Sequence, residues 1–179
     1  MKRRSWMLGA AGAAAAGAGA GWQWWRAPVA APLAASGAPD EATRAFWQMS
    51  FTQPDGPSLA MQSLRGQPLV LNFWATWCPP CVKEMPELDR FARHFSGRGG
   101  QVLGLAVDNP TAVRQFLART PVGYRIALAG FDGTDLSRKL GNTVGALPFT
   151  AVFNRAGVLV QRKLGETTFD ELAGWVQGL

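Results

Sequence analysis

The chain predicts an α/β fold built on a mixed central sheet, on three observations. From about residue 46 onward, short continuous apolar runs alternate with amphipathic stretches, which is the pattern of strands separated by helices. Residues 149–179 instead carry two apolar runs and then one helical stretch, which indicates a terminal hairpin and helix. Hydrophobic residues make up 47% of the 179 residues and charged residues 17%, so a sizeable core can be buried.

Residues 1–26 have the composition of an export signal or an N-terminal membrane anchor. A basic head, Lys2-Arg3-Arg4, precedes an uncharged run over residues 5–25. The twin arginines and the following residues resemble a twin-arginine export signal, with Trp6-Met7 where that motif usually has Phe-Leu.

Two interpretations of this segment stay open. Cleavage can occur at either of two small-residue sites, 27–30 or 31–34. Alternatively residues 5–25 stay as an anchor, because about 20 residues suffice to span a bilayer. Either way the remainder is exported, so we expect a periplasmic protein, secreted or anchored to the inner membrane.

The rest of the chain divides into a linker and one domain. Residues 27–45 are predicted to be a Pro/Ala-rich linker and residues 46–179 the folded domain. Of the 18 basic residues, four lie in the first 26, and the remainder carries 14 basic against 12 acidic residues. This near-neutral balance, without a Lys/Arg cluster, excludes nucleic acid as a partner.

The domain opens with a predicted hairpin over residues 46–61, broken at Pro54-Asp55-Gly56-Pro57. Next, residues 68–75 (PLVLNFWA) form a continuous apolar run, which is typical of a strand buried on both faces. A helix follows over residues 79–95, where apolar side chains recur at three- and four-residue steps. The later predicted elements are strands at 101–107, 124–128, 149–154 and 158–164, and helices at 111–119, 134–140 and 167–178.

Both cysteines of the chain, Cys78 and Cys81, lie where this buried strand gives way to the helix. A bridge across two residues closes too short a loop to constrain the unfolded chain, so the pair is not placed for stability. The positive end of the helix dipole stabilises a thiolate at Cys78, which prepares it to attack a disulfide. Cys81, one turn later, can then resolve the mixed disulfide.

A metal site is the first alternative for this pair. Zinc needs four ligands, and the chain's single histidine, His94, lies roughly 20 Å along the helix from Cys78 at 1.5 Å per residue. We therefore expect neither a metal nor another cofactor in the chain. A copper-binding metallochaperone that uses the two thiols stays open as a non-enzymatic alternative, although the five Met residues do not cluster.

The segment LNFWATWCPPCVKEMPEL resembles the active site of the thioredoxin superfamily, in particular its TlpA-like branch of bacterial envelope thiol–disulfide oxidoreductases. The resemblance runs from about residue 46 to the C-terminus. It implies a thioredoxin fold, with a mixed central sheet flanked by helices and an added N-terminal β-hairpin. It also implies that Cys78 is the exposed attacking thiol and Cys81 the buried resolving one, with Trp77 beside them.

The same resemblance assigns further residues to the site. Ala146-Leu147-Pro148-Phe149-Thr150 matches the cis-proline loop, in which Pro148 faces the cysteines and Leu147 offers its backbone to substrate. Asn72 stands where cytoplasmic thioredoxins have a buried Asp, so it cannot accept the proton of Cys81. Glu84 matches a Glu of the TlpA-like branch. It is either a desolvated proton acceptor for Cys81 or a solvated carboxylate paired with Lys83.

These residues predict a protein-disulfide reductase that acts on cysteine-containing envelope proteins, including those of cytochrome c maturation. A membrane thiol reductase is the implied electron donor. A peroxiredoxin-type redoxin is disfavoured, because Ala75 stands where that enzyme has Thr, three residues before its reactive cysteine.

Overall fold

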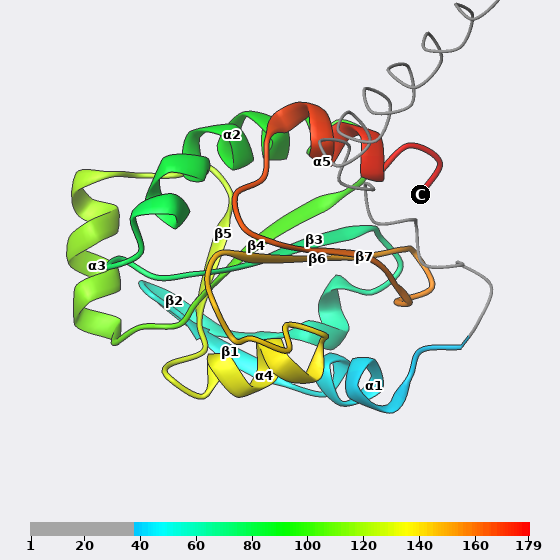
Figure 1. Cartoon of the computed structure of the whole chain (residues 1–179), viewed down its shortest axis with the longest axis horizontal. Coiled ribbons are helices and arrows are strands. Elements are labelled where there is room, and N and C mark those ends of the chain that lie inside the picture. Colours follow the sequence, from blue (N-terminus) through cyan, green and yellow to red (C-terminus); the bar gives the residue numbers. More distant parts are fainter. Residues whose placement is uncertain (1–37) are drawn as a thin grey trace, which may run out of the picture. The chain divides into compact units, whose positions relative to one another are not determined.

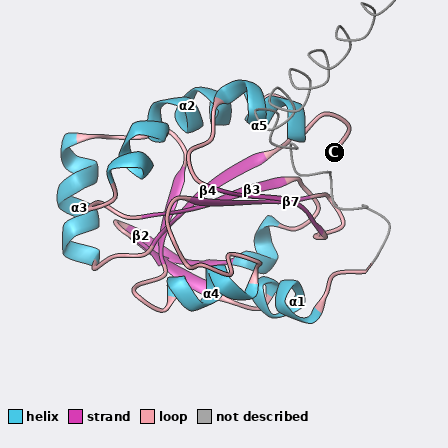
Figure 2. Cartoon of the chain, viewed as in Figure 1, coloured by secondary structure: helices cyan, strands magenta, loops and turns pink. Residues whose placement is uncertain are grey.

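Seven strands of residues 38–179, the part of the chain that the structure describes, form one sheet in the order β2-β1-β5-β4-β3-β6-β7. The structure is a computed structural model (Figure 1, Figure 2). The strands are β1 Ser50–Gln53, β2 Gly56–Ala60, β3 Leu69–Trp74, β4 Gln101–Ala106, β5 Arg125–Leu128, β6 Phe149–Phe153 and β7 Leu159–Leu164. Strands β3, β4 and β5 are parallel, and β1, β2, β6 and β7 join them in antiparallel pairs. The predicted mixed sheet is confirmed.

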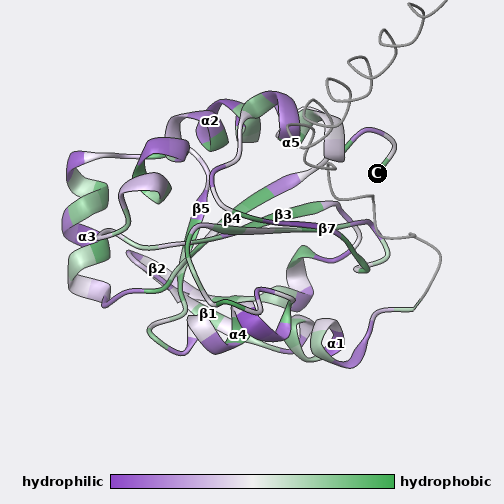
Figure 3. Cartoon of the chain, viewed as in Figure 1, coloured by the Kyte–Doolittle hydropathy of each residue, from purple (hydrophilic) through white to green (hydrophobic). Residues whose placement is uncertain are grey.

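Helices cover both faces of this sheet. They are α1 Glu41–Trp47, the 3-10 turn η2 Met61–Leu64, α2 Pro79–Ser96, α3 Pro110–Arg119, α4 Gly133–Lys139 and α5 Phe169–Trp175. Figure 1 shows α2 and α5 together on one side of the sheet and α1 and α4 on the other. Each face buries its own apolar cluster, one beneath α2 and α5 and one above α1 and α4. Figure 3 shows the central strands mostly in hydrophobic colours, as expected for strands covered on both faces.

The start of the folded part differs from the prediction. The hairpin of β1 and β2 is confirmed, but a helix, α1, precedes it inside the stretch assigned to the linker. The side chain of Asp40 caps this helix by accepting the Thr43 N–H at 2.8 Å. Phe46 and Trp47 are buried against the sheet. The boundary at residue 46 is therefore wrong, because α1 begins at Glu41 and its buried residues include Thr43, before that boundary.

Of the predicted N-terminal features, the export signal or anchor (1–26) and linker residues 27–37 lie outside the described residues. Among residues 38–179, no helix combines the length and the hydropathy that crossing a membrane requires.

Candidate functional site

Cys78 and Cys81 form a disulfide at the N-terminus of α2, with an S–S distance of 2.01 Å. Cys78 is the N-cap residue, and its sulfur accepts the Cys81 N–H at 3.3 Å. Pro79 and Pro80 fill the first positions of the helix, where a missing N–H removes no hydrogen bond. The sulfur of Cys78 therefore lies where unpaired N–H groups and the helix dipole stabilise negative charge.

The two cysteines differ less in exposure than expected. Cys81 is fully buried and Cys78 is only 4% exposed, so the expected exposed thiol is not seen in the disulfide form. The bond to the buried Cys81 holds the Cys78 sulfur against the apolar cluster that also contains Trp74 and Ala75. Because Cys81 has no accessible surface, an incoming thiol can reach the pair only at Cys78.

Trp77, directly before Cys78, is 62% exposed. A buried indole would be explained by packing, whereas this one presents its ring to solvent beside the disulfide. It therefore lies where the resemblance places it, flanking the cysteines.

The Leu147–Pro148 peptide bond is cis, as predicted. Pro148 is buried, and its carbonyl accepts the Gly165 N–H at 2.8 Å, which ties the loop to the end of β7. Leu147 is partly buried and packs against the cluster that contains both cysteines. Within residues 38–179, neither the N–H nor the C=O of Leu147 has a hydrogen-bond partner. Phe149, directly after Pro148, pairs with Phe73, so the loop lies at the end of β3 that leads to Cys78, with one backbone unit free to pair.

Glu84 is buried on α2, one turn after Cys81, with 2% of its surface exposed. Its Oε1 accepts from the Asn72 side-chain amide at 2.8 Å. Its Oε2 accepts from the Thr167 N–H at 2.7 Å and the Thr167 hydroxyl at 2.9 Å. The alternative of a solvated Glu84 paired with Lys83 is wrong, because Lys83 pairs with Glu166 at 2.7 Å.

Burial raises the pKa of Glu84 above its ordinary value, because the charged form loses water. Hydrogen bonds from Thr167 and Asn72 oppose that rise, and the neighbouring Glu166 adds to it. A carboxylate with a raised pKa is a better base for a thiol than an ordinary one.

Two members of this buried polar group were not predicted from the sequence. Thr150 lies opposite Asn72 in the β3–β6 pairing and accepts its amide at 3.1 Å. A polar residue within the apolar β6 was the available signal for Thr150. Thr167 is 83 residues from Glu84, and nothing in its own stretch of sequence signalled the contact.

Among residues 38–179, no group of three or more His, Cys, Asp or Glu side chains lies together in a way that could hold a metal ion. His94 is exposed on α2, and its ring meets the edge of Phe169 at 5.5 Å between centroids.

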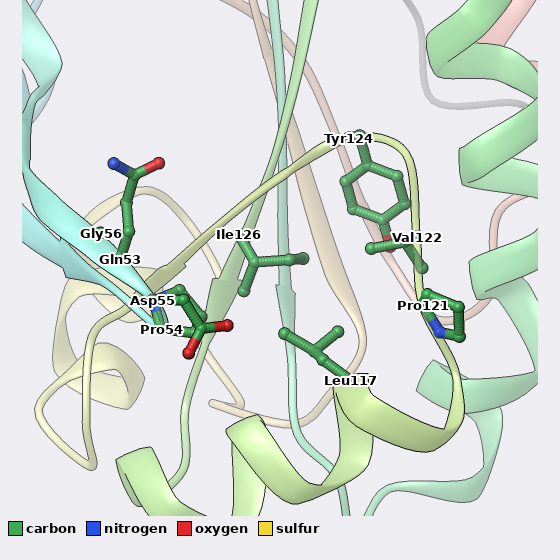
Figure 4. Close-up of a pocket in the computed structure, with 9 residues that line it drawn as sticks. All are labelled: Gln53, Pro54, Asp55, Gly56, Leu117, Pro121, Val122, Tyr124 and Ile126. Carbon is green, nitrogen blue, oxygen red and sulfur yellow. The ribbon is translucent and has the colours of Figure 1, made fainter.

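A surface pocket of about 360 Å³ is shown in Figure 4. The turn of the β1–β2 hairpin, the end of α3 and the start of β5 line it. Neither cysteine and no residue of the cis-proline loop is among the residues that line it. The pocket is therefore separate from the redox pair.

A helix-capping Cys-x-x-Cys disulfide, an exposed Trp before it and a cis-proline loop on a mixed α/β sheet define a thiol–disulfide oxidoreductase of the thioredoxin fold. Residues 35–174 match the model of the Redoxin family, and the chain belongs to that family.

Individual relatives agree with this class. The chain is similar to thiol-disulfide oxidoreductase ResA of Bacillus cereus, at 30% identity over 70% of this chain and 71% of the relative. A thioredoxin-related protein from Neisseria meningitidis serogroup B superposes with a TM-score of 0.63 at 33% identity, over 72% of this chain and 96% of that one. The structure of DsbF from Mycobacterium tuberculosis (MTB) superposes with a TM-score of 0.64 at 29% identity, over 79% of this chain and 98% of that one.

Proposed function

We propose that the chain is an exported reductant that opens disulfides in other envelope proteins, including cytochrome c precursors. The observation that carries this proposal is the Cys78–Cys81 disulfide at the helix N-terminus, beside a loop with an unpaired backbone unit at Leu147. A substrate strand that pairs with Leu147 would bring its own disulfide to Cys78.

The reaction begins with the reduced pair. The Cys78 thiolate attacks one sulfur of the substrate disulfide, so that a mixed disulfide forms and the other substrate sulfur leaves as a thiolate. Cys81 then gives its proton to Glu84, attacks the Cys78 sulfur and releases the second substrate thiol. Two electrons pass to the substrate, and the Cys78–Cys81 disulfide is the product.

Each cycle ends with an oxidised pair, so an external dithiol must restore it. We propose a membrane thiol reductase as this donor. Residues 1–26 would deliver the domain to the periplasm, either as a cleaved signal or as an anchor that keeps it at the membrane.

Single-cysteine variants test the assigned roles. Cys78→Ala should abolish the reduction of insulin, whereas Cys81→Ala should accumulate mixed disulfides with envelope proteins, since nothing resolves them. If Cys78→Ala retains activity and Cys81→Ala traps nothing, the roles are reversed.

The direction of electron flow is tested by the redox potential. A value near that of thioredoxin, about −270 mV, supports a reductant, and a value near about −120 mV makes the protein an oxidant instead. Metal analysis after purification under reducing conditions tests the copper-binding alternative, which requires retained Cu(I).

A further inference from the structure

Asp108 lies beside the loop that carries the redox cysteines, although no sequence pattern singled it out. Strands β3 and β4 are parallel, with Trp74 paired to Ala106 at their ends, and the Val107 N–H donates to the Trp74 carbonyl at 2.8 Å. The residues after each strand are therefore neighbours. Asp108 follows β4 there and is 3% exposed.

The Asp108 carboxylate binds Thr76 by two hydrogen bonds. One oxygen accepts the Thr76 hydroxyl at 2.6 Å and the Thr76 N–H at 3.0 Å. The other oxygen accepts the Asn109 N–H at 2.7 Å and its side-chain amide at 3.3 Å. Both carboxylate oxygens therefore accept hydrogen bonds, and Thr76 donates to Asp108 through its backbone N–H and through its hydroxyl.

Thr76 is part of the turn that presents the disulfide. The Cys78 N–H donates to the Ala75 carbonyl at 3.3 Å, so Thr76 and Trp77 are the two central residues of a turn that closes on Cys78. Trp77 is exposed, and within residues 38–179 its ring packs against no other aromatic ring and no cation. Within residues 38–179, the two hydrogen bonds that join Thr76 to a side chain outside the turn both go to Asp108.

The charge of Asp108 has a second consequence. Among residues 38–179, no Lys, Arg or His lies within ion-pair distance of it. A carboxylate bound to the residue two positions before Cys78 disfavours a thiolate there, in opposition to the helix N-terminus. Because a stabilised thiolate favours the reduced form, disfavouring it makes the pair a stronger reductant.

We propose that Asp108 is a positioning residue for the redox pair, which fixes the Thr76–Trp77 turn and biases the Cys78–Cys81 couple toward electron donation. This inference deepens the proposed reductase function and rests on it. It assigns the two effects to separable features, the hydrogen bonds to Thr76 and the charge of the carboxylate.

The charge is tested by Asp108→Asn, which keeps size and removes one negative charge. Equilibration of the full chain with glutathione should shift at least about threefold toward the dithiol form, or about 14 mV at 29.6 mV per tenfold. Asp135→Asn is the matched control, because Asp135 is an exposed carboxylate paired with Arg138. An Asp108→Asn variant whose equilibrium equals that of the control, or moves toward the disulfide, overturns the electrostatic part.

The turn is tested by Thr76→Val and Thr76→Ser, which differ in the hydroxyl that Asp108 accepts. Thr76→Val should lower kcat/KM for insulin, by about fivefold, because the turn loses the hydrogen bond between the Thr76 hydroxyl and the Asp108 carboxylate. Its glutathione equilibrium should stay unchanged, because the carboxylate remains. Thr76→Ser should retain the wild-type rate. Equal rates in both variants overturn the positioning role, and this pair decides it even if Asp108→Asn does not fold.

The glutathione equilibrium involves no envelope substrate, so this test is separable from that of the proposed function. A wild-type protein that proves to be an oxidant would remove the reductase proposal. The difference between Asp108→Asn and wild type would still report on Asp108.

Discussion

Asn72 and Glu84 form a buried pair of one amide and one carboxylate. Replacing the amide with a second carboxylate would lower the stability of the folded protein. The Asn72 amide donates to Glu84 Oε1 at 2.8 Å, and both residues are almost fully buried. Asn72→Asp would place two buried carboxyl groups within hydrogen-bond distance, where like charges hold one of them protonated. We expect the variant to lose about 3 kcal/mol of unfolding free energy at pH 7 and less at pH 5.

A reciprocal exchange provides the control for this prediction. In N72D/E84Q the amide introduced at position 84 can donate to the carboxylate introduced at position 72, which restores one hydrogen bond with the roles reversed. Urea denaturation should show the double variant to be more stable at pH 7 than Asn72→Asp alone. If the second substitution adds to the loss instead, the two groups do not interact as the structure places them.

Glu84 should also leave a signature in the pH dependence of stability. A pKa raised in the folded state means that the native protein binds this proton more tightly than the unfolded chain does. The unfolding free energy should therefore fall as pH rises from the ordinary value of 4.5 through the raised pKa. Glu84→Gln should remove that pH-dependent loss, in either the oxidised or the reduced protein, because the glutamine side chain does not titrate.

The oxidised protein is the cleaner sample for this measurement, because its cysteines do not titrate. Glu41→Gln, at an exposed site on α1, is the control and should keep the wild-type slope. In the reduced protein, Glu84→Gln should change the pH–rate profile of exchange, because Cys81 loses its proton acceptor. Unchanged profiles would leave Glu84 a structural carboxylate.

At the scale of elements, the clearest difference between sequence and structure is α1. Strand β3 and helix α2 were predictable, because a six-residue apolar strand and an 18-residue helix carry strong periodic signals. Helix α1 has only seven residues and follows an Ala/Pro-rich stretch, so its sequence resembles a linker. The capping residue Asp40 was the one local signal of a helix there. Its helical state depends on burial of Phe46 and Trp47 against the sheet, which is a tertiary effect.

The candidate site was predictable to the same extent and for the same reason. Cys78, Cys81, Trp77 and Glu84 lie within one strand–turn–helix segment, so local sequence places them together. The contacts of Thr167 with Glu84 and of Asp108 with Thr76 join residues 83 and 32 positions apart. No local pattern reports such contacts, because they depend on which strands pair.

Trp47 tests whether α1 is an integral element of the domain. Its side chain is 2% exposed, stacks edge-on against Phe46 and Phe153, and donates its Nε1–H to the Gly157 carbonyl at 2.8 Å. Trp47→Ala should lower the unfolding free energy by about 3–5 kcal/mol, because it leaves a cavity and an unpaired carbonyl. Gln48→Ala, exposed on the next residue, should change it by less than about 0.5 kcal/mol. A loss below about 1 kcal/mol for Trp47→Ala would make α1 a peripheral attachment.

At the scale of the whole molecule, the redox state of the cysteine pair is coupled to the stability of the fold. Cys78 and Cys81 belong to the cluster beneath α2 and α5, which also contains Leu88 and Leu172. Oxidation or reduction of the two sulfurs therefore affects the packing of this core. A thermodynamic cycle links the two properties. The folded domain can make the pair a stronger reductant than the unfolded chain only by stabilising its disulfide form relative to its dithiol form.

The proposed reductant therefore predicts that the oxidised protein is the more stable form. Thermal denaturation of the full chain, with and without excess dithiol, should therefore give the higher Tm for the disulfide form. An oxidant would show the reverse order, since its reduced form is the stabilised one. Asp108→Asn should narrow the gap between the two Tm values, because a neutral residue there makes the dithiol form less unfavourable. A higher Tm for the dithiol form of the wild-type protein would contradict the direction of electron flow proposed for this domain.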